Sequence, residues 1–149
     1  MEVKKILCAV DLEDTIAPSV EYAKMMASMT GASILVAYVI PAHTPYEDVY
    51  LSVNNQPNEV NNPNETIQKS MNALLAEQFA GMDATGVILV GRPSEELVKL
   101  AEDKGSNLIV MGTHGRAGFD RLLFGSVAHE VVRAAPCPVM TVRPLMPKK

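Results

Sequence analysis

Five short apolar runs, separated by segments with helical spacing, limit this chain to one fold class. The runs are rich in valine and isoleucine and mostly continuous rather than alternating, which is typical of strands covered on both faces. They span residues 6–10, 34–40, 87–90, 108–111 and 139–142. Strands that alternate with helices form right-handed βαβ units around a parallel sheet. The sequence therefore predicts an α/β fold.

Apolar residues spaced three and four apart predict helices between these strands. The stripes are Ile16, Val20, Ala23 and Ala27, then Ile67, Met71, Leu74, Leu75 and Phe79, then Leu97, Val98, Leu100 and Ala101, and last Val127, Val131 and Val132. Pro93 and Ser94 mark the start of the third helix, and Gly105 marks its end. Each helix is expected to pack one apolar face on the sheet.

Length and composition fit a single domain spanning residues 1–149. Of the 149 residues, 48% are apolar and 20% are charged, which is globular composition. No apolar run approaches the roughly 20 residues needed to cross a bilayer, so no membrane partner is expected. The formal charge of −4 argues against a nucleic-acid polymer as partner, because phosphate backbones are bound mainly by lysine and arginine. The first residues lack a secretory signal pattern, so we expect a cytoplasmic protein.

The segment from about 41 to 65 interrupts the alternation of strands and helices. It contains six asparagines and four prolines and shows little periodicity. A loop of this length inside a compact domain is usually a lid, an interaction segment or a disordered excursion. The sequence leaves these alternatives open.

The two cysteines give no sign of a disulfide framework or a metal site. Cys8 lies in an apolar run and Cys137 lies between two prolines, without CxxC spacing or a grouping with histidine. We therefore expect two plain thiols that are buried or half-buried. No catalytic set of serine, histidine and aspartate is apparent either.

Glycines concentrate in one segment after the fourth strand. Four of the nine glycines lie from Gly112 to Gly125, and Gly125 and Ser126 are expected to open the fourth helix. Glycine permits positive φ angles and close approach of the backbone to a ligand. The unpaired N–H groups at a helix start attract anions. The stretch 112–127 therefore predicts a phosphate-binding loop, and the alternative is a turn-rich loop with no ligand.

The spacing of these glycines distinguishes the segment from common nucleotide motifs. The chain has no GxxxxGK(S/T) sequence, which excludes a P-loop NTPase, and no GxGxxG after the first strand. It has instead Gly-x2-Gly-x9-Gly-Ser, formed by Gly112, Gly115, Gly125 and Ser126. This spacing resembles the nucleotide-binding signature of the universal stress protein family, in its ATP-binding branch.

The resemblance extends over nearly the whole chain. Lys4 to Asp11 is similar to the family's first strand and its terminal aspartate, and residues 107–112 are similar to its fourth strand. The resemblance implies a Rossmann-like, open five-stranded parallel sheet with strand order 3-2-1-4-5 and helices on both faces. A ligand would then lie where the carboxyl ends of strands one and four meet. Asp11 and Gly112 are expected at those two ends.

Through the same resemblance, nine residues are assigned to an adenine nucleotide. Asp11 would contact the ribose or a phosphate-bound metal, the backbone around Val39 would contact the adenine, and the glycine loop would hold the phosphates. The set is Asp11, Val39, Met111, Gly112, His114, Gly115, Gly125, Ser126 and Val127. The implied nucleotide is ATP, with ADP or AMP as alternatives.

One segment departs from the family's pattern. The loop after the first strand reads Asp11-Leu12-Glu13-Asp14, which is more acidic than the family's frequent Asp-Gly-Ser or Asp-Phe-Ser. Three carboxylates near a triphosphate would repel it unless a divalent cation such as Mg²⁺ lies between them or the side chains point away. The number of bound phosphates and the metal therefore stay open.

Three functions are compatible with the sequence. The resemblance implies a nucleotide-binding regulatory protein with little chemistry of its own. The alternatives are a slow Mg²⁺-dependent ATPase or nucleotide-transferring enzyme that uses Asp11, His114 or Asp120, and an interaction domain without nucleotide. The resemblance also implies a homodimer paired through the last strand, at residues 138–142.

Overall fold

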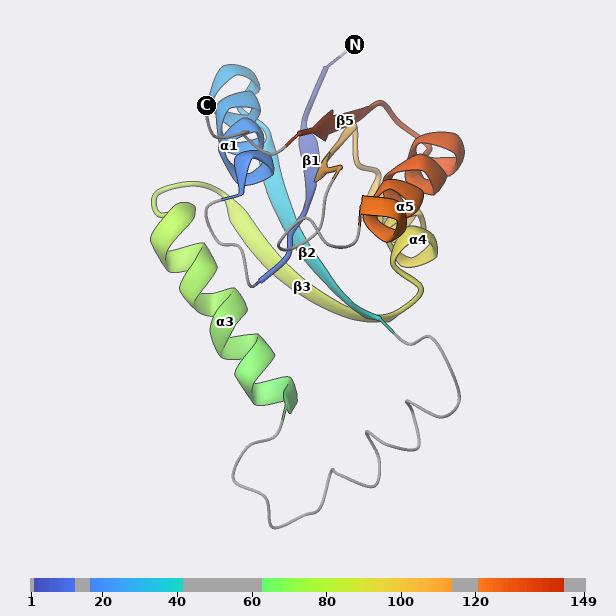
Figure 1. Cartoon of the computed structure of the whole chain (residues 1–149). Coiled ribbons are helices and arrows are strands. Elements are labelled where there is room, and N and C mark those ends of the chain that lie inside the picture. The colour runs from blue at the N-terminus through green and yellow to red at the C-terminus, as the bar shows by residue number, and fades with distance from the viewer. Residues whose placement is uncertain (1, 13–16, 42–62, 114–120, 144–149) are drawn as a thin grey trace, which may run out of the picture.

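The computed structural model describes residues 2–12, 17–41, 63–113 and 121–143. In these ranges strands and helices alternate along the chain (Figure 1). They are β1 (Lys5–Ala9), α1 (Pro18–Thr30), β2 (Ser33–Pro41), α3 (Pro63–Gln78), β3 (Ala84–Gly91), α4 (Pro93–Lys104), β4 (Leu108–Gly112), α5 (Arg121–Ala134) and β5 (Val139–Val142). The strands form one parallel sheet in the order β3-β2-β1-β4-β5. The predicted α/β fold and strand order are confirmed.

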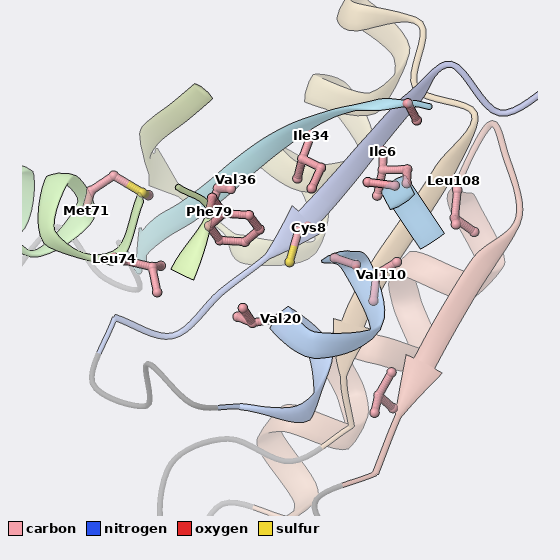
Figure 2. Close-up of a cluster of buried hydrophobic side chains, with 14 residues drawn as sticks. Ile6, Cys8, Val20, Ile34, Val36, Met71, Leu74, Phe79, Leu108 and Val110 are labelled. Atoms are coloured by element: carbon pink, nitrogen blue, oxygen red, sulfur yellow. The ribbon is translucent and has the colours of Figure 1, made fainter. Parts of the chain in front are cut away.

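Side chains that alternate along the strands divide the interior into two cores. Ile6 and Cys8 of β1 point to one face of the sheet, where they pack with α1 and α3 (Figure 2). Leu7 points to the opposite face and packs with α4 and α5. Figure 1 shows the two helix pairs on opposite sides of the sheet. Because successive residues of a strand face opposite ways, a strand covered on both sides needs a continuous apolar sequence.

The edge strands are less buried than their sequences predict. Val90 of β3 is 59% exposed, and Val142 is the one buried residue of the four in β5. β3 also begins at Ala84, three residues before the predicted start, because it pairs with β2 from Ile34 onward. Coverage on both faces was the wrong expectation for these two strands, since the helices cover the edges of the sheet only in part.

Proline and glycine set the ends of α4. Pro93 follows the N-cap residue Arg92, and its missing N–H costs no helical hydrogen bond at that position. Gly105 ends the helix in the left-handed conformation, with φ at 65°, and donates its N–H to the Ala101 C=O. Both predicted ends of this helix are confirmed.

The two cysteines are free thiols, as expected. Cys8 is buried and Cys137 is half-buried. Burial raises the pKa of the Cys8 thiol to about 12 and also raises the pKa of Cys137. The Cys8 thiol is therefore protonated and acts as a small apolar side chain of the core.

Gly86 of β3 gives a direct test of how α3 packs on the sheet. A Cβ atom at Gly86 would lie 2.6 Å from Met71 Cγ and 3.1 Å from Leu75 Cδ1, both on α3. Gly86→Val should therefore lower the free energy of unfolding by about 1–3 kcal/mol, the usual cost of overpacking a core. Urea unfolding measures this, with the exposed neighbour Thr85 replaced by valine as the matched control. Equal stability of the two variants would contradict this packing.

Candidate functional site

The carboxyl ends of β1 and β4 meet at one edge of the sheet. Cys8 of β1 pairs with Val110 of β4, and each strand ends one or two residues further on. Val10 continues past β1 and donates its N–H to the Ala37 C=O, 2.9 Å away. The chain leaving β1 leads to α1 on one face, and the chain leaving β4 leads to α5 on the other. Connections that diverge in this way mark the place where open parallel sheets bind ligands.

Asp11 lies at this edge, two residues after the end of β1. It is half-buried, and its negative charge acts on Tyr38 of β2. Burial raises the pKa of the Tyr38 hydroxyl, and the Asp11 carboxylate raises it further because a second negative charge nearby is unfavourable. Asp11 therefore lies near the ends of β1 and β2. Glu13 and Asp14, the other two acids of the loop, lie outside the described residues.

The backbone of Val39 is turned toward the same edge. In β2, the Ser33 N–H donates to the Lys4 C=O, and the Ala37 C=O accepts from the Val10 N–H. Alternate residues of β2 therefore turn their backbone groups toward β1. Val39 continues this alternation two residues beyond Ala37, where β1 has ended. Its N–H and C=O therefore point past the end of β1, while its side chain is buried in the core.

Met111 and Gly112 close the other side of the edge. Met111 is 1% exposed and packs in the core under α4 and α5. Gly112 pairs with Val142, and Thr113 donates its N–H to the Val142 C=O at 3.0 Å. The structure thus brings Asp11, the Val39 backbone and Gly112 to one edge. His114 and Gly115 lie outside the described residues.

The helix that follows the glycine segment begins earlier than predicted. α5 starts at Arg121, so Gly125 and Ser126 lie in its second turn, and the expectation that they open the helix is wrong. The residues Arg-Leu-Leu-Phe before Gly125 have helix propensities well above that of glycine, which explains the earlier start. Ser126 is exposed and Val127 is half-buried against the core. Ser126 can therefore offer its side chain to a ligand, but it is not the N-cap.

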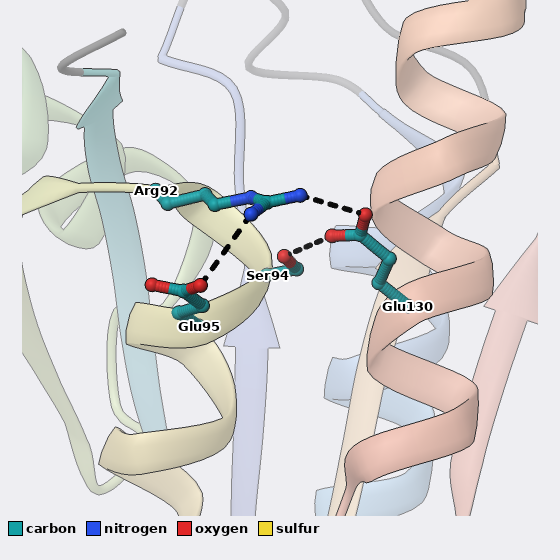
Figure 3. A network of polar contacts seen from close by, with 4 residues as sticks. All are labelled: Arg92, Ser94, Glu95 and Glu130. Atoms are coloured by element: carbon teal, nitrogen blue, oxygen red, sulfur yellow. Dashed lines mark hydrogen bonds and ion pairs between the residues drawn. The ribbon is translucent and has the colours of Figure 1, made fainter.

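A polar network joins the start of α4 to α5 (Figure 3). Arg92 donates from Nη2 to Glu130 Oε1 at 3.0 Å, and its Nη1 lies 3.5 Å from Glu95 Oε1. Ser94 donates its hydroxyl to the other carboxylate oxygen of Glu130. These hydrogen bonds hold the pKa of Glu130 below its usual range, with Ser94 as the largest cause and Arg92 as a further one.

Sequence reasoning missed this network. Ser94 and Glu130 are 36 residues apart, so no local spacing links them. Ser94 was predicted only to mark the start of a helix. The network borders a cavity of about 420 Å³ between α4 and α5, lined by Arg92, Ser94, Glu95, Val98, Lys99, Glu102, Glu130 and Ala134.

The hydrogen bond from Ser94 predicts a measurable shift at Glu130. Ser94→Ala should raise the pKa of Glu130 toward its ordinary value, because the largest stabiliser of the carboxylate is lost. Stability contributed by a lowered carboxyl pKa is present above the unfolded-state pKa and disappears as pH falls through the folded-state pKa. The variant should thus lose less stability than the wild type on acidification. Carboxyl-carbon NMR titration measures the pKa.

A matched control comes from Ser106, at the opposite end of α4. Its hydroxyl is buried and has no hydrogen-bond partner in the described part of the chain. Ser106→Ala should therefore leave the pKa of Glu130 unchanged. An unchanged pKa in Ser94→Ala would instead contradict the hydrogen bond.

Two kinds of feature are missing from the described residues. They contain no group of three or more histidine, cysteine, aspartate or glutamate side chains that could hold a metal ion. Among the same residues, no helix combines the length and apolar character needed to cross a bilayer.

Comparison with known proteins identifies the family. The model of the universal stress protein family matches residues 2–143. The chain belongs to this family. The resemblance to this family is thereby confirmed, and the strand order found in the structure agrees with it.

Three members of the same fold illustrate how similar the chain is to known universal stress proteins. Universal stress protein MJ0577 of Methanocaldococcus jannaschii is 29% identical over 94% of each chain. The solved structure of MJ0577 superposes with a TM-score of 0.79 and covers 99% of this chain and 100% of its own. A universal stress protein in complex with cAMP has a TM-score of 0.69 at 21% identity, covering 96% of this chain and 98% of its own. One from Archaeoglobus fulgidus in complex with dAMP has a TM-score of 0.56 at 23% identity, covering 95% and 98%.

Proposed function

We propose that this universal stress protein binds an adenine nucleotide, with ATP as the main ligand, where β1 and β4 end. The observation that carries the proposal is the meeting of three groups at one edge: the Asp11 carboxylate, the Val39 backbone and Gly112. Divergence of the connections after β1 and β4 favours this edge as a ligand site. The cAMP and dAMP complexes of two proteins with this fold support adenine nucleotides as the ligand class.

The groups at this edge suit the parts of an adenine nucleotide. An N–H and a C=O on one residue, as Val39 offers past the end of β1, can pair with the donor and acceptor atoms of an adenine edge. Asp11 can accept hydrogen bonds from ribose hydroxyls or ligate Mg²⁺ held by the phosphates. The phosphates would lie along 112–127, with Gly112, His114, Gly115, Gly125, Ser126 and Val127 around them.

Isothermal titration of the purified protein tests the proposal. We expect saturable binding of ATP with Mg²⁺, binding of ADP and AMP, and much weaker binding of GTP, because a guanine edge reverses the donor and acceptor pattern. Absence of binding for every adenine nucleotide, in protein shown to carry none from purification, would contradict the proposal. Nucleotide-independent partner binding would then favour the interaction domain instead.

We also propose that two copies pair through β5, which lies at an edge of the sheet in the described residues. Pro138 and Val142 accept hydrogen bonds from Ile109 and Thr113 on the β4 side. Successive residues of a strand turn their backbone groups to opposite sides, so those of Val139 and Thr141 point away from β4. Such an edge can pair with a second copy of itself.

Light scattering measures the assembly directly. A dimer should have twice the 16.1 kDa mass of one chain at micromolar concentration. Thr141→Pro should yield a folded monomer, because proline removes an outward N–H but none of the hydrogen bonds to β4. A monomeric wild-type protein would refute the dimer.

A further inference from the structure

Arg92 lies outside the residues assigned to the nucleotide, yet it sets the charge next to them. Figure 3 shows its side chain extending from the start of α4 to Glu130 on α5. The Nη2–Oε1 distance to Glu130 is 3.0 Å, and the Nη1–Oε1 distance to Glu95 is 3.5 Å. One guanidinium thus faces two carboxylates from two helices.

Glu130 is one helical turn from the phosphate end of the proposed site. Ser126 and Glu130 are four residues apart within α5, so their Cβ atoms lie about 6 Å apart on the same helix face. Hydrogen bonds from Ser94 and Arg92 hold the Glu130 carboxylate in place. Without Arg92, a nucleotide with phosphates near Ser126 would meet this negative charge on the next turn.

We propose that Arg92 is a positioning residue for nucleotide selectivity: by neutralising Glu130 next to Ser126, it permits a polyphosphate to bind where the carboxylate alone would favour a monophosphate. This inference rests on the proposed nucleotide site. Arg92 acts here through Glu130 and needs no contact with the ligand. Arginine suits the role because its guanidinium stays charged at every physiological pH and binds carboxylates in a fixed geometry.

The size of the effect follows from Coulomb's law. One unit charge about 8 Å from one phosphate charge changes affinity by between about 2-fold and 30-fold, depending on solvent screening. ATP places more negative charge at this end than AMP does. Loss of Arg92 should therefore weaken ATP more than AMP, and loss of the Glu130 charge should reverse the change.

The experiment measures dissociation constants of ATP and AMP for the wild type and three variants by isothermal titration. In Arg92→Ala, the Kd of ATP relative to that of AMP should rise about fivefold or more. In Arg92→Ala/Glu130→Gln, the ratio should return to within about twofold of the wild-type value. Lys104→Ala also removes one positive charge, but at the far end of α4, about 18 Å along the helix from Arg92. It should leave the ratio unchanged, since this separation exceeds the Debye length of about 8 Å.

Each outcome decides between distinct explanations. If Arg92 only held α4 against α5, removing Glu130 as well would not restore the ratio, and that result would overturn the inference. An unchanged ratio in Arg92→Ala would also overturn it, while leaving the nucleotide site intact. Failure of the wild type to bind either nucleotide would overturn the site and the inference together. Thermal unfolding of every variant confirms that the chains compared are folded.

Discussion

Ile109→Ala should lower the free energy of unfolding by about 2–5 kcal/mol, the range measured for truncation of buried isoleucines. Ile109 is 0% exposed and lies in β4, paired with Leu7 of β1 on one side and Val139 of β5 on the other. Its side chain belongs to the core under α4 and α5. The close packing of that core leaves the lost volume as a cavity, which adds to the lost transfer free energy.

Thermal and urea unfolding measure this loss. For a domain of this length the thermal midpoint should fall by about 6–15 °C, at roughly 3 °C for each kcal/mol. Val132→Ala is the matched control, because Val132 is 53% exposed on α5 and should change stability by less than about 0.5 kcal/mol. If Ile109→Ala lowered the free energy of unfolding by less than about 1 kcal/mol, the core would be shown to close around the smaller side chain without leaving a cavity.

Binding of ATP with Mg²⁺ should raise the thermal midpoint of the wild type by several degrees, and Gly115→Val/Ser126→Ala should lose that shift. A ligand at 100 times its Kd stabilises the native state by about 2.7 kcal/mol. Gly115 belongs to the glycine signature, where a valine side chain would obstruct close approach of phosphate to the backbone. Ser126 would lose the hydroxyl that α5 presents at its second turn.

The control for this variant is Ser28→Ala, a change of the same chemistry at an exposed position near the end of α1. It should keep the full nucleotide-dependent shift. A folded Gly115→Val/Ser126→Ala variant that also keeps the shift would place the phosphates elsewhere. No shift in the wild type, once bound nucleotide from purification is excluded, would remove the basis of the proposed site.

Part of the proposed site could be predicted because it depends on strand ends. Asp11 and Gly112 directly follow apolar runs, and parallel strands bring such ends to one edge. Val39 was assigned through the family resemblance, and the register of β1 with β2 supplies the physical reason, since β1 ends two residues short of it. The start of α5 was predicted wrongly because glycine was given the role of a helix start, whereas the helix begins at Arg121.

The sequence by itself determined the strands, the helices and their alternation, because apolar periodicity reports which faces must leave water. Together with the glycine spacing, this also led to the family. Only the tertiary structure decided which residues share an edge or a helix interface. Arg92, Ser94 and Glu130 meet because α4 and α5 pack on the same face of the sheet, and residues 36 apart leave no periodic signal when they do so. Contacts of that kind depend on how elements pack, which no local spacing records.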